Sequence, residues 1–560
     1  MKRNDWIYLA IILIVAFAFR MLLALRFGAI GFDEVNYLKL AASGNIYGLN
    51  HVLHTYWSPF YPLVTALFSY IIPDYETAGR MVSVLSATFV LLPLFFFTRQ
   101  YYSKKIAFGT IILTALFSFS AYFSAKAEAD SLYSLISISS IVLGWSILKS
   151  KSVMRSIWLG ILFGFAYLTR PEGIGLLIVF VIILLAIVLF HIIKRLQWKS
   201  YGSILILTFL MFVVTSLPYI IYLHQATGQW TISAKGAANQ QGSSFVMKKG
   251  AKAVHPFHVL SEDNKTLKQD EIYHLGTFNK SIKSEGSAPI KVSVKDIAKK
   301  YSENIYNLFS EALPKLMPLP LILLLSLGLF AIPWKKEQLH VNLYILAFIV
   351  FFWFGVVPVF HVTLRYFIPL LPLIFIFLVS GIDVFSKWFE GSIGNYFSIG
   401  SRAGLIRIGG VSLAILMILV SSIIPEFGKR MRKNTFSTDE WAPCIEQKKA
   451  GKWLKQNSDE IPVVMAYNHA VSFYAGNYNI KESVEIPLNE IDRVMEYMTH
   501  RDVKYLVLND RYRHKAPLIS HLFDKRDVPS SLELVYEKEE KNGLRTLIYE
   551  INVNEENNHE

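Results

Sequence analysis

The chain has 560 residues, of which 53% are hydrophobic and only 18% are charged. Soluble domains carry about a quarter charged residues, so this balance excludes an ordinary soluble protein, and the many aliphatic and Phe residues exclude intrinsic disorder. The single cysteine, Cys444, excludes a disulfide scaffold and a zinc site built from thiolates. The net charge of +14 does not indicate nucleic-acid binding, because the basic residues form short clusters between long apolar runs.

A helix that crosses a bilayer needs about 20 apolar residues, and the first 424 residues contain about eleven stretches that approach this length. The predicted spans are Trp6–Leu25, Ala78–Phe97, Ile106–Tyr122, Leu132–Leu148, Ile157–Thr169, Ile174–Ile193, Ile204–Leu223, Leu316–Pro333, Val341–Phe360, Tyr366–Phe385 and Leu405–Ile424. A further stretch, Pro59–Ile72, is interrupted by Pro62 and is predicted to lie at the interface. A signal peptide is the alternative for the first span, but Arg26 and Phe27 follow it without a small-residue cleavage pattern.

The distribution of Lys and Arg predicts the orientation. With the N-terminus inside, the cytoplasmic segments would hold Lys2, Arg3, Arg99, Lys104, Lys105, Lys149, Lys151, Arg155, Lys194, Arg195, Lys199, Lys335, Lys336, Lys387, Arg402 and Arg407. The short outer segments would hold only Arg26, Lys39, Lys126, Arg170 and Arg365. Because positive charge accumulates on the cytoplasmic side, the sequence predicts a multi-pass protein of the cytoplasmic membrane with its N-terminus inside and its C-terminus outside.

The other ionisable residues near the spans then fall on the outer face. They follow the first, third, fifth and ninth spans, and they are Asp33, Glu34, Lys126, Glu128, Asp130, Arg170, Glu172, His361 and Arg365. Charged residues at helix ends can simply anchor those ends at the interface. Since four short connections on one face carry them, we instead expect them to converge on one polar cavity, which would contain the active site.

Two outer loops (26–77 and 224–315) and a C-terminal tail complete the chain. In the second loop, the apolar spacing of Ser293–Phe309 predicts an amphipathic helix. From residue 425 to 560 the composition is that of a soluble domain, and its patterns predict a small extracytoplasmic α/β domain. The expected elements are helices at Ile445–Gln456 and Glu490–Met498, strands at Pro462–Ala466 and Tyr505–Leu508, and a hairpin of Leu532–Tyr536 with Leu544–Ile551. No motif in this domain indicates catalysis.

The segment Gly31–Tyr37 carries the strongest chemical signal. A carboxylate at the membrane surface requires a cation, a metal or a proton to accept, so Asp33 is a candidate general base. The alternative is that Asp33 caps a helix that begins at Glu34. The next segment, Tyr56–Pro62, is rich in aromatic residues and proline and suits the wall of a pocket, although an interfacial aromatic belt has the same composition.

Several groups of residues together resemble motifs of the GT-C glycosyltransferases. They are Asp33-Glu34, Pro59-Phe60-Tyr61-Pro62 with Arg80, Glu128 with Asp130, Leu168–Gly173 around Arg170, and Arg365-Tyr366 followed by Pro369 and Pro372. The nearest branch is the protein mannosyltransferase and aminoarabinose transferase group, which uses polyprenyl-phosphate-linked sugars. The likeness covers residues 1 to about 425 and implies a transmembrane GT-C catalytic domain (1–424) that carries the extracytoplasmic domain (425–560).

The resemblance also assigns roles. Asp33 matches the catalytic base and Glu34 its neighbour, while Asp130, with Glu128, matches an acid that holds the acceptor, a metal or the phosphate. Arg80, Arg170 and Arg365 match arginines that pair with the donor phosphate, which the planar guanidinium can bind through two hydrogen bonds. Further candidates for substrate binding are His361, Tyr61, Tyr56 and Lys126. A divalent metal ion at Asp33, Glu128 or Asp130 is left open, and no other cofactor is predicted.

Two departures limit the resemblance. The aminoarabinose enzymes resemble a pattern with Lys or His just before the Pro-rich segment, but Tyr56 and Trp57 stand there in this chain, with His54 nearby, so the phosphate contact expected from that basic residue is left open. A Trp-Trp-Asp-Tyr-Gly run is absent, which argues against the oligosaccharyltransferase branch.

The predicted function is inverting transfer of a sugar from a polyprenyl-phosphate donor to a lipid, glycan or protein acceptor at the outer face of the membrane. A flippase for lipid-linked glycans, without chemistry, is one alternative. It is disfavoured because the acids lie at helix ends and no two-fold repeat is evident. A glycan polymerase or ligase is the other alternative, and it would share the donor and the location.

Overall fold

A computed structural model describes residues 2–235, 259–267, 294–331, 333–360, 362–397, 403–418, 444–541 and 543–552. The chain divides into two compact units, each built from separate stretches of sequence. Unit 1 comprises Met1–Leu25, Arg80–Pro218 and Ser293–Arg430, and unit 2 comprises Arg26–Gly79, Tyr219–Val292 and Met431–Glu560. The predicted domain boundary at residues 424 and 425 lies outside the described residues and stays a prediction.

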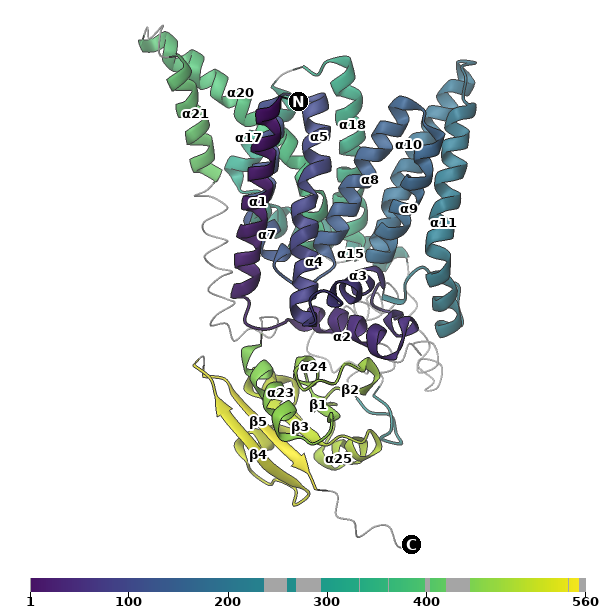
Figure 1. Cartoon of the computed structure of the whole chain (residues 1–560), viewed down its shortest axis with the longest axis vertical. Helices are drawn as coiled ribbons and strands as arrows, with labels where there is room; N and C mark the ends of the chain where they lie inside the picture. Colours follow the sequence, from purple (N-terminus) through teal and green to yellow (C-terminus); the bar gives the residue numbers. More distant parts are fainter. Residues whose placement is uncertain are drawn as a thin grey trace. The chain divides into compact units, whose positions relative to one another are not determined.

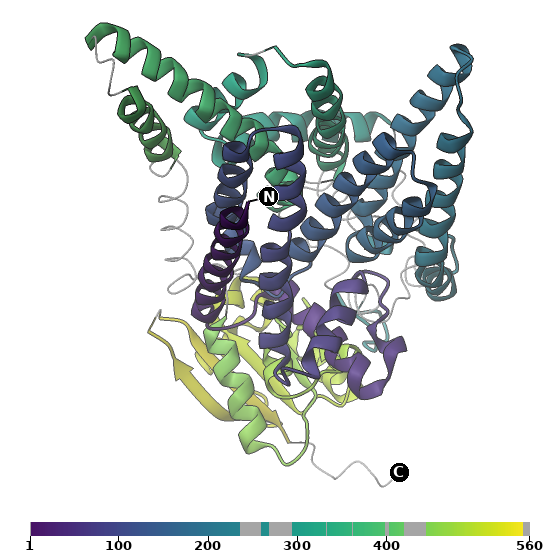
Figure 2. The same ribbon diagram turned by 45° about the horizontal axis from the view of Figure 1, so that its top comes forward.

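Unit 1 is helical, and α8, α9 and α10 run side by side in both views of the ribbon (Figure 1 and Figure 2). Its helices are α1 (Arg3–Arg26), α5 (Leu91–Tyr101), α6 (Lys104–Leu116), α7 (Ser118–Ser124), α8 (Asp130–Ser150), α9 (Val153–Thr169), α10 (Ile174–Ile193), α15 (Val294–Asn307), α16 (Leu313–Leu316), α17 (Leu319–Phe330), α18 (Lys336–Val350), α19 (Val357–Phe360), α20 (Leu371–Phe397) and α21 (Ala403–Ile418). The helices α4 (Tyr75–Phe89) and α11 (Lys199–Thr227) each contribute several residues to both units.

The predicted spans fall largely on helices where the structure describes them, which confirms a polytopic α-helical membrane protein; residues 419–424 of the last predicted span lie outside the described residues. Among the described residues, seven helices are long and apolar enough to cross a membrane, or up to nine if each of two bent pairs is one span. The helices α9, α3 (Phe60–Ser69) and Arg407–Ile418 are apolar but shorter. The number of eleven spans therefore stays a prediction. The amphipathic helix expected at Ser293–Phe309 is present as α15.

The predicted span Ile106–Tyr122 is broken within its length. Phe117 has an extended backbone (φ −63°, ψ 123°), so α6 ends and α7 begins at an angle of 57° to it. A second bend lies at the start of the predicted span Leu316–Pro333: Pro318 lacks an N–H and precedes α17, which makes an angle of 94° with the preceding helix. The break at Phe117 was not predicted, because an apolar run shows how long a buried segment is and does not show where its backbone bends.

A buried arginine supports the first break. Arg20, in the apolar helix α1, is 1% exposed, and its Nη2 donates a hydrogen bond to the main-chain carbonyl of Thr114 at 3.3 Å. That carbonyl lies in the last turn of α6, where the helical ladder supplies no N–H for it. The guanidinium thus hydrogen-bonds one of the carbonyl groups that the break leaves without a helical partner.

Glycines allow a close crossing of α17 and α20. A Cβ atom added at Gly328 would lie 1.8 Å from the carbonyl oxygen of Phe377, and one added at Gly381 would lie 1.7 Å from that of Leu324. The two backbones therefore touch at this crossing, as they do where small residues line helix contacts in membranes.

Unit 2 contains the C-terminal sheet, whose strand order is β2-β1-β3-β5-β4. The strands are β1 (Val464–Ala466), β2 (Ser483–Val484), β3 (Tyr505–Asn509), β4 (Leu532–Glu539) and β5 (Arg545–Ile551), and the helices are α23 (Ile445–Asn457), α24 (Ala470–Tyr474) and α25 (Ile491–His500). Strand β1 pairs in parallel with β2 and β3, whereas β5 is antiparallel to β3 and β4. These elements confirm the helices, strands and hairpin expected for a small α/β domain.

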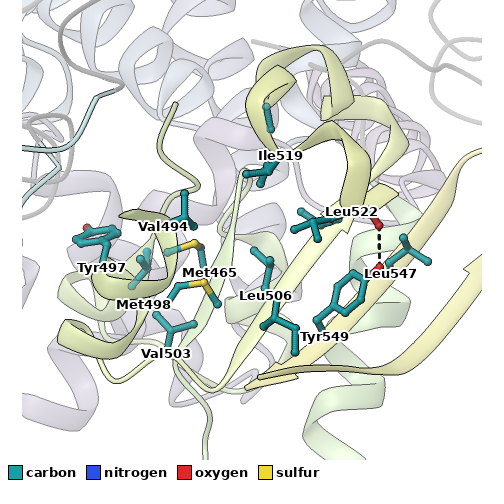
Figure 3. Packing of buried hydrophobic residues seen from close by; sticks show 14 of the residues in the cluster. Met465, Val494, Tyr497, Met498, Val503, Leu506, Ile519, Leu522, Leu547 and Tyr549 are labelled. Carbon is teal, nitrogen blue, oxygen red and sulfur yellow. Dashed lines mark hydrogen bonds between the residues drawn. The ribbon is translucent and has the colours of Figure 1, made fainter. Parts of the chain in front are cut away.

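The core of this sheet is packed by aliphatic and aromatic side chains from both helices and strands (Figure 3). Met465, Leu506 and Leu547 come from three strands, and Val494 and Met498 come from α25. The hydroxyl of the buried Tyr549 donates a hydrogen bond to the carbonyl oxygen of Leu522 at 2.7 Å, drawn as a dashed line in Figure 3. Unit 2 also contains α2 (Phe32–Tyr47) and α3 of the first outer loop.

Candidate active site

Four of the predicted site residues meet at helix ends in unit 1. Asp130 is the first residue of α8, and Glu128 precedes it by two positions. Arg170 follows the last residue of α9 in an extended conformation, because Pro171 disfavours a helical backbone in the residue before it. Arg365 lies in the 3-10 turn Leu364–Leu370, which leads into α20. The start of α8, the end of α9 and the turn before α20 thus lie close together, and each carries a charged side chain.

Asp130 is the centre of this group. Its side chain is 1% exposed, and its Oδ1 accepts a hydrogen bond from Nη1 of Arg170. Its Oδ2 accepts one from Nε of Arg365 at 2.7 Å, and Nη2 of Arg365 lies 3.2 Å from Oε2 of Glu128. A buried carboxylate is stable only when it is paired, and Asp130 has an arginine on each oxygen.

Two further residues complete the group, which we call the Asp130 cluster: Lys126, Glu128, Asp130, Arg170, Glu172 and Arg365. Nζ of Lys126 lies 3.2 Å from Oε1 of Glu128, and Nη2 of Arg170 lies 3.4 Å from Oε1 of Glu172. The cluster holds as many cations as carboxylates. It is also tied to α4, since Oγ of Ser83 donates a hydrogen bond to the carbonyl oxygen of Glu128 at 3.1 Å.

A small pocket lies beside the cluster within unit 1. Its polar lining comes from Arg170, Glu172, Tyr133 and Tyr366, and its apolar lining from Phe352, Val356, Val357 and Pro369. The Arg170 guanidinium lies 5.0 Å from the ring centre of Tyr366 and 5.9 Å from that of Tyr133. The lining therefore offers a guanidinium to an anion and apolar side chains to an apolar chain.

Arg80 lies inside α4, which begins at Tyr75, three residues before the predicted span Ala78–Phe97. Its Nη1 donates a hydrogen bond to the carbonyl oxygen of Ala24 at 3.2 Å, near the end of α1. It is one turn from Ser83, which contacts Glu128. Arg80 therefore lies within one helical turn of a residue that contacts the cluster.

In unit 2, the Asp33–Glu34 pair lies in the first turn of α2. The helix begins at Phe32 with Gly31 as its N-cap, so Asp33 is not the cap of a helix that begins at Glu34. Glu34 has the capping role, since its Oε2 accepts a hydrogen bond from the N–H of Gly31 at 2.7 Å and its side chain is fully buried. Asp33 is half-buried. The two neighbouring acids thus differ, and only Asp33 remains exposed enough to meet a substrate.

The aromatic segment also lies in unit 2. Tyr61 is fully buried, and its hydroxyl donates a hydrogen bond to the carbonyl oxygen of Gly79 at 2.8 Å, which is a packing role. Tyr56 is half-buried. The residues just before this segment are bound by α11, because the hydroxyls of Tyr219 and Tyr222 donate hydrogen bonds to the carbonyl oxygens of His54 and Leu53.

Lys235 is a cation that the sequence did not indicate. Its Nζ lies 4.9 Å from the ring centre of Tyr56 and 4.8 Å from that of Trp57. These are the two residues that stand where the resembling enzymes have a basic residue. Lys235 comes from the second outer loop, far along the chain, and no periodicity or motif marks it.

His361 lies outside the described residues. Among the residues that are described, no group of three or more His, Cys, Asp or Glu side chains could hold a metal ion. Asp130 in particular does not suit a metal in this arrangement, because arginines occupy both of its oxygens. The metal stays a prediction, and no step below depends on it.

The apolar helices define a polytopic membrane protein, which also contains a small C-terminal sheet and a charged cluster at helix ends. Residues 56–221 match the family model of dolichyl-phosphate-mannose-protein mannosyltransferases. No curated protein sequence matches the chain.

Solved structures of membrane glycosyltransferases resemble the whole chain. One is the Archaeoglobus fulgidus oligosaccharyltransferase tethered to an acceptor peptide with the NVT sequon (12% identity, TM-score 0.55, 99% of this chain and 74% of that chain). Another is the same organism's AglB with an inhibitory peptide and dolichol-phosphate (12%, TM-score 0.51, 98% and 74%). ArnT from Cupriavidus metallidurans bound to undecaprenyl phosphate gives 12% identity and a TM-score of 0.50 over 98% of both chains. At these identities the likeness establishes the fold, and it confirms the fold class expected from the sequence.

Proposed function

We propose that this protein transfers a sugar from a polyprenyl-phosphate-linked donor to an acceptor at the outer face of the cytoplasmic membrane. The observation that carries the proposal is the Asp130 cluster with its adjoining pocket. The match of residues 56–221 to a lipid-phosphate-dependent family supports the donor class, as does the fold shared with proteins that bind dolichol-phosphate or undecaprenyl phosphate.

The donor phosphate is proposed to bind the arginines of the cluster. A guanidinium can bind phosphate through two parallel hydrogen bonds, and Arg170 lines the pocket. The phosphate must compete with carboxylates that already hold the arginines. The contact between Arg170 and Glu172 is the longest of these, at 3.4 Å, and Glu172 is the most exposed of the carboxylates. Phosphate should therefore displace Glu172 most readily. Phe352 and Val356 in the same pocket suit an isoprenoid chain.

Asp33 is proposed to act as the general base. It accepts the proton of the acceptor while the acceptor oxygen or nitrogen bonds to the anomeric carbon, and the bond from that carbon to the phosphate oxygen breaks. The lipid phosphate leaves with the bonding electron pair, and the anomeric configuration inverts. Cationic side chains stabilise the charge that develops on the leaving phosphate. Lys235, held over Tyr56 and Trp57, is proposed as a further such cation.

The test of this proposal is Asp33→Asn. Asparagine keeps the shape of the side chain and cannot accept the proton, so transfer from a radiolabelled polyprenyl-phosphate sugar to acceptors in isolated membranes should fall about a hundred- to ten-thousand-fold. Binding of the donor should persist, measured by retention of labelled lipid on the purified protein. Glu34→Gln is the matched control, since Gln retains an oxygen that can accept the Gly31 N–H, and its effect should be milder.

Near-normal turnover by Asp33→Asn would remove Asp33 as the base. If the wild-type protein moves labelled donor across the membrane of reconstituted vesicles and forms no new glycosidic bond, the protein is a flippase and the proposed enzymatic function is wrong. Transfer of a whole glycan in place of a single sugar would indicate the polymerase or ligase alternative.

A further inference from the structure

The helix that carries Asp33 presents two different faces to the rest of unit 2. On one face, four residues after Asp33, the ring of Tyr37 packs edge-on against those of Trp57 and Tyr61 at centroid distances of 5.1 and 5.3 Å. On another face, Lys39 and Ser43 are also four residues apart and therefore lie one above the other. Each face has its own partner, and the second partner is the C-terminal domain.

The start of the acid-bearing turn is held by a tyrosine of that domain. The N–H of Ile30, immediately before the N-cap, donates a hydrogen bond to the hydroxyl of Tyr474 at 3.0 Å. The same hydroxyl donates to Oε2 of Glu76 at 2.9 Å, and Lys448 lies 2.9 Å from that oxygen. Ile30, Glu76 and Tyr474 are all buried, so each of these bonds is costly to leave unmade.

Two further contacts fix the helix farther along. The ammonium of Lys39, which is fully buried, donates hydrogen bonds to Oγ of Ser472 at 2.9 Å and to Oγ of Ser483 at 2.5 Å. Burial lowers the pKa of Lys39 to about 7, and nearby Glu482 opposes this shift. Oγ of Ser43 donates to the carbonyl oxygen of Tyr478 at 2.7 Å. Since Ser472 and Tyr474 both belong to α24, one short helix of the C-terminal domain contacts the residue just before the N-cap of α2 and the middle of that helix.

We propose that the C-terminal domain serves catalysis by positioning α2, with Tyr474 as the positioning residue for Asp33. The inference rests on the proposed function. It assigns to this domain, which has no catalytic motif of its own, the task of holding the turn Gly31–Glu34 in place. A displacement of about 1 Å at a reacting group can lower the rate about a hundredfold. Loss of the hydrogen bond at Ile30 could therefore lower the rate measurably by letting the turn shift.

The experiment compares Tyr474→Phe with wild type. The change removes one oxygen and retains the ring, so the turn loses its anchor while the packing stays. We expect kcat for sugar transfer to fall about tenfold or more, with the KM for the donor unchanged, because donor and base are held by different residues. The matched control is Tyr549→Phe, which removes a buried hydroxyl bonded to Leu522 in the same domain without contact to α2, and it should leave kcat unchanged. Ser43→Ala is a milder second variant, and its kcat should change in the same direction as that of Tyr474→Phe.

A second measurement reports the position of the turn without any activity. Asp33→Cys is labelled with a water-soluble methanethiosulfonate in the presence and absence of Tyr474→Phe. The native Cys444 should stay silent, because it is buried and burial raises the pKa of its thiol to about 12. Labelling should become faster in the double variant, since an unanchored turn opens more often.

A fall in kcat with faster labelling supports the proposal. Unchanged kcat in Tyr474→Phe, or unchanged labelling, overturns it, because α24 would then not set the position that catalysis needs. Wild-type protein without any transfer activity would count against the proposed function instead, and the labelling result would still decide whether α24 holds the turn.

Discussion

At the scale of single residues, the two arginines of the Asp130 cluster are bound differently. Arg365 reaches two carboxylates, Asp130 and Glu128, and remains 20% exposed. Arg170 is more deeply buried, and it contacts two aromatic rings as well as two carboxylates. Substitution by lysine keeps the charge and removes the planar fork in both cases, but the consequences should differ because the surroundings differ.

We predict that Arg365→Lys weakens donor binding more than it weakens folding. Loss of a hydrogen bond to a charged group costs about 1.5–3 kcal/mol, so the KM for the donor should rise about ten- to a hundredfold. Arg170→Lys should lower both donor binding and the melting temperature, because its packing against Tyr366 and Tyr133 is lost too. The readouts are donor titrations and thermal unfolding in detergent.

The control for both is Arg407→Lys, which lies elsewhere in unit 1 and pairs with Asp383 and Glu390. It should leave the KM for the donor unchanged. An unaltered KM in Arg365→Lys would show that this arginine only neutralises Asp130 and Glu128.

At the scale of elements, the crossing of α17 and α20 is the most sensitive contact to test. We predict that Gly328→Ala destabilises the protein by about 1–3 kcal/mol, the usual cost of overpacking, because the new methyl group would overlap a main-chain carbonyl that cannot rotate away. The measurement is the melting temperature in lipid nanodiscs. Gly391→Ala, also in α20, has no atom within 4 Å of the added Cβ and should be neutral or slightly stabilising. Equal melting temperatures for the two variants would contradict the close crossing.

Helices and strands were predictable where local sequence determines them. The helices predicted from the apolar runs of unit 1 and the strands predicted for the C-terminal sheet are present, and their ends differ from the predicted ends by a few residues. The break at Phe117 was not predictable, because Phe117 is an ordinary apolar residue and the bend beside it is stabilised by Arg20, 94 residues before Thr114. Such a contact leaves no mark on the local pattern.

The meeting of Asp130, Arg170 and Arg365 was predictable for a related reason. The order of the spans assigns the short connections that carry these residues to one face, where their side chains can converge. The capping role of Glu34 was missed, since glycine at the N-cap gives no side-chain signal. Lys235 was missed because no local sequence pattern distinguishes it from the other lysines of the long polar loop.

At the scale of the whole molecule, the orientation of the chain in the membrane is the prediction with the widest reach. Reporter fusions after Lys104, Lys199 and Lys336 should be cytoplasmic, and fusions after Ser261 and Asn457 should be extracytoplasmic, since the basic residues favour this arrangement. Alkaline phosphatase and green fluorescent protein, which are active on opposite sides, provide the measurement. A cytoplasmic fusion after Asn457 would place the domain that holds α2 on the wrong side for an outer-face enzyme.

The burial of Arg20 has a consequence for how the chain is made. A charged guanidinium in an apolar helix is costly in lipid, and its partner, the carbonyl of Thr114, is synthesised 94 residues later. At about 5–20 residues per second, roughly 5–20 seconds separate the appearance of the two groups. During that interval α1 has to keep Arg20 at the membrane surface or beside the insertion machinery. The contact of α1 with α6 can therefore form only after α6 has been synthesised.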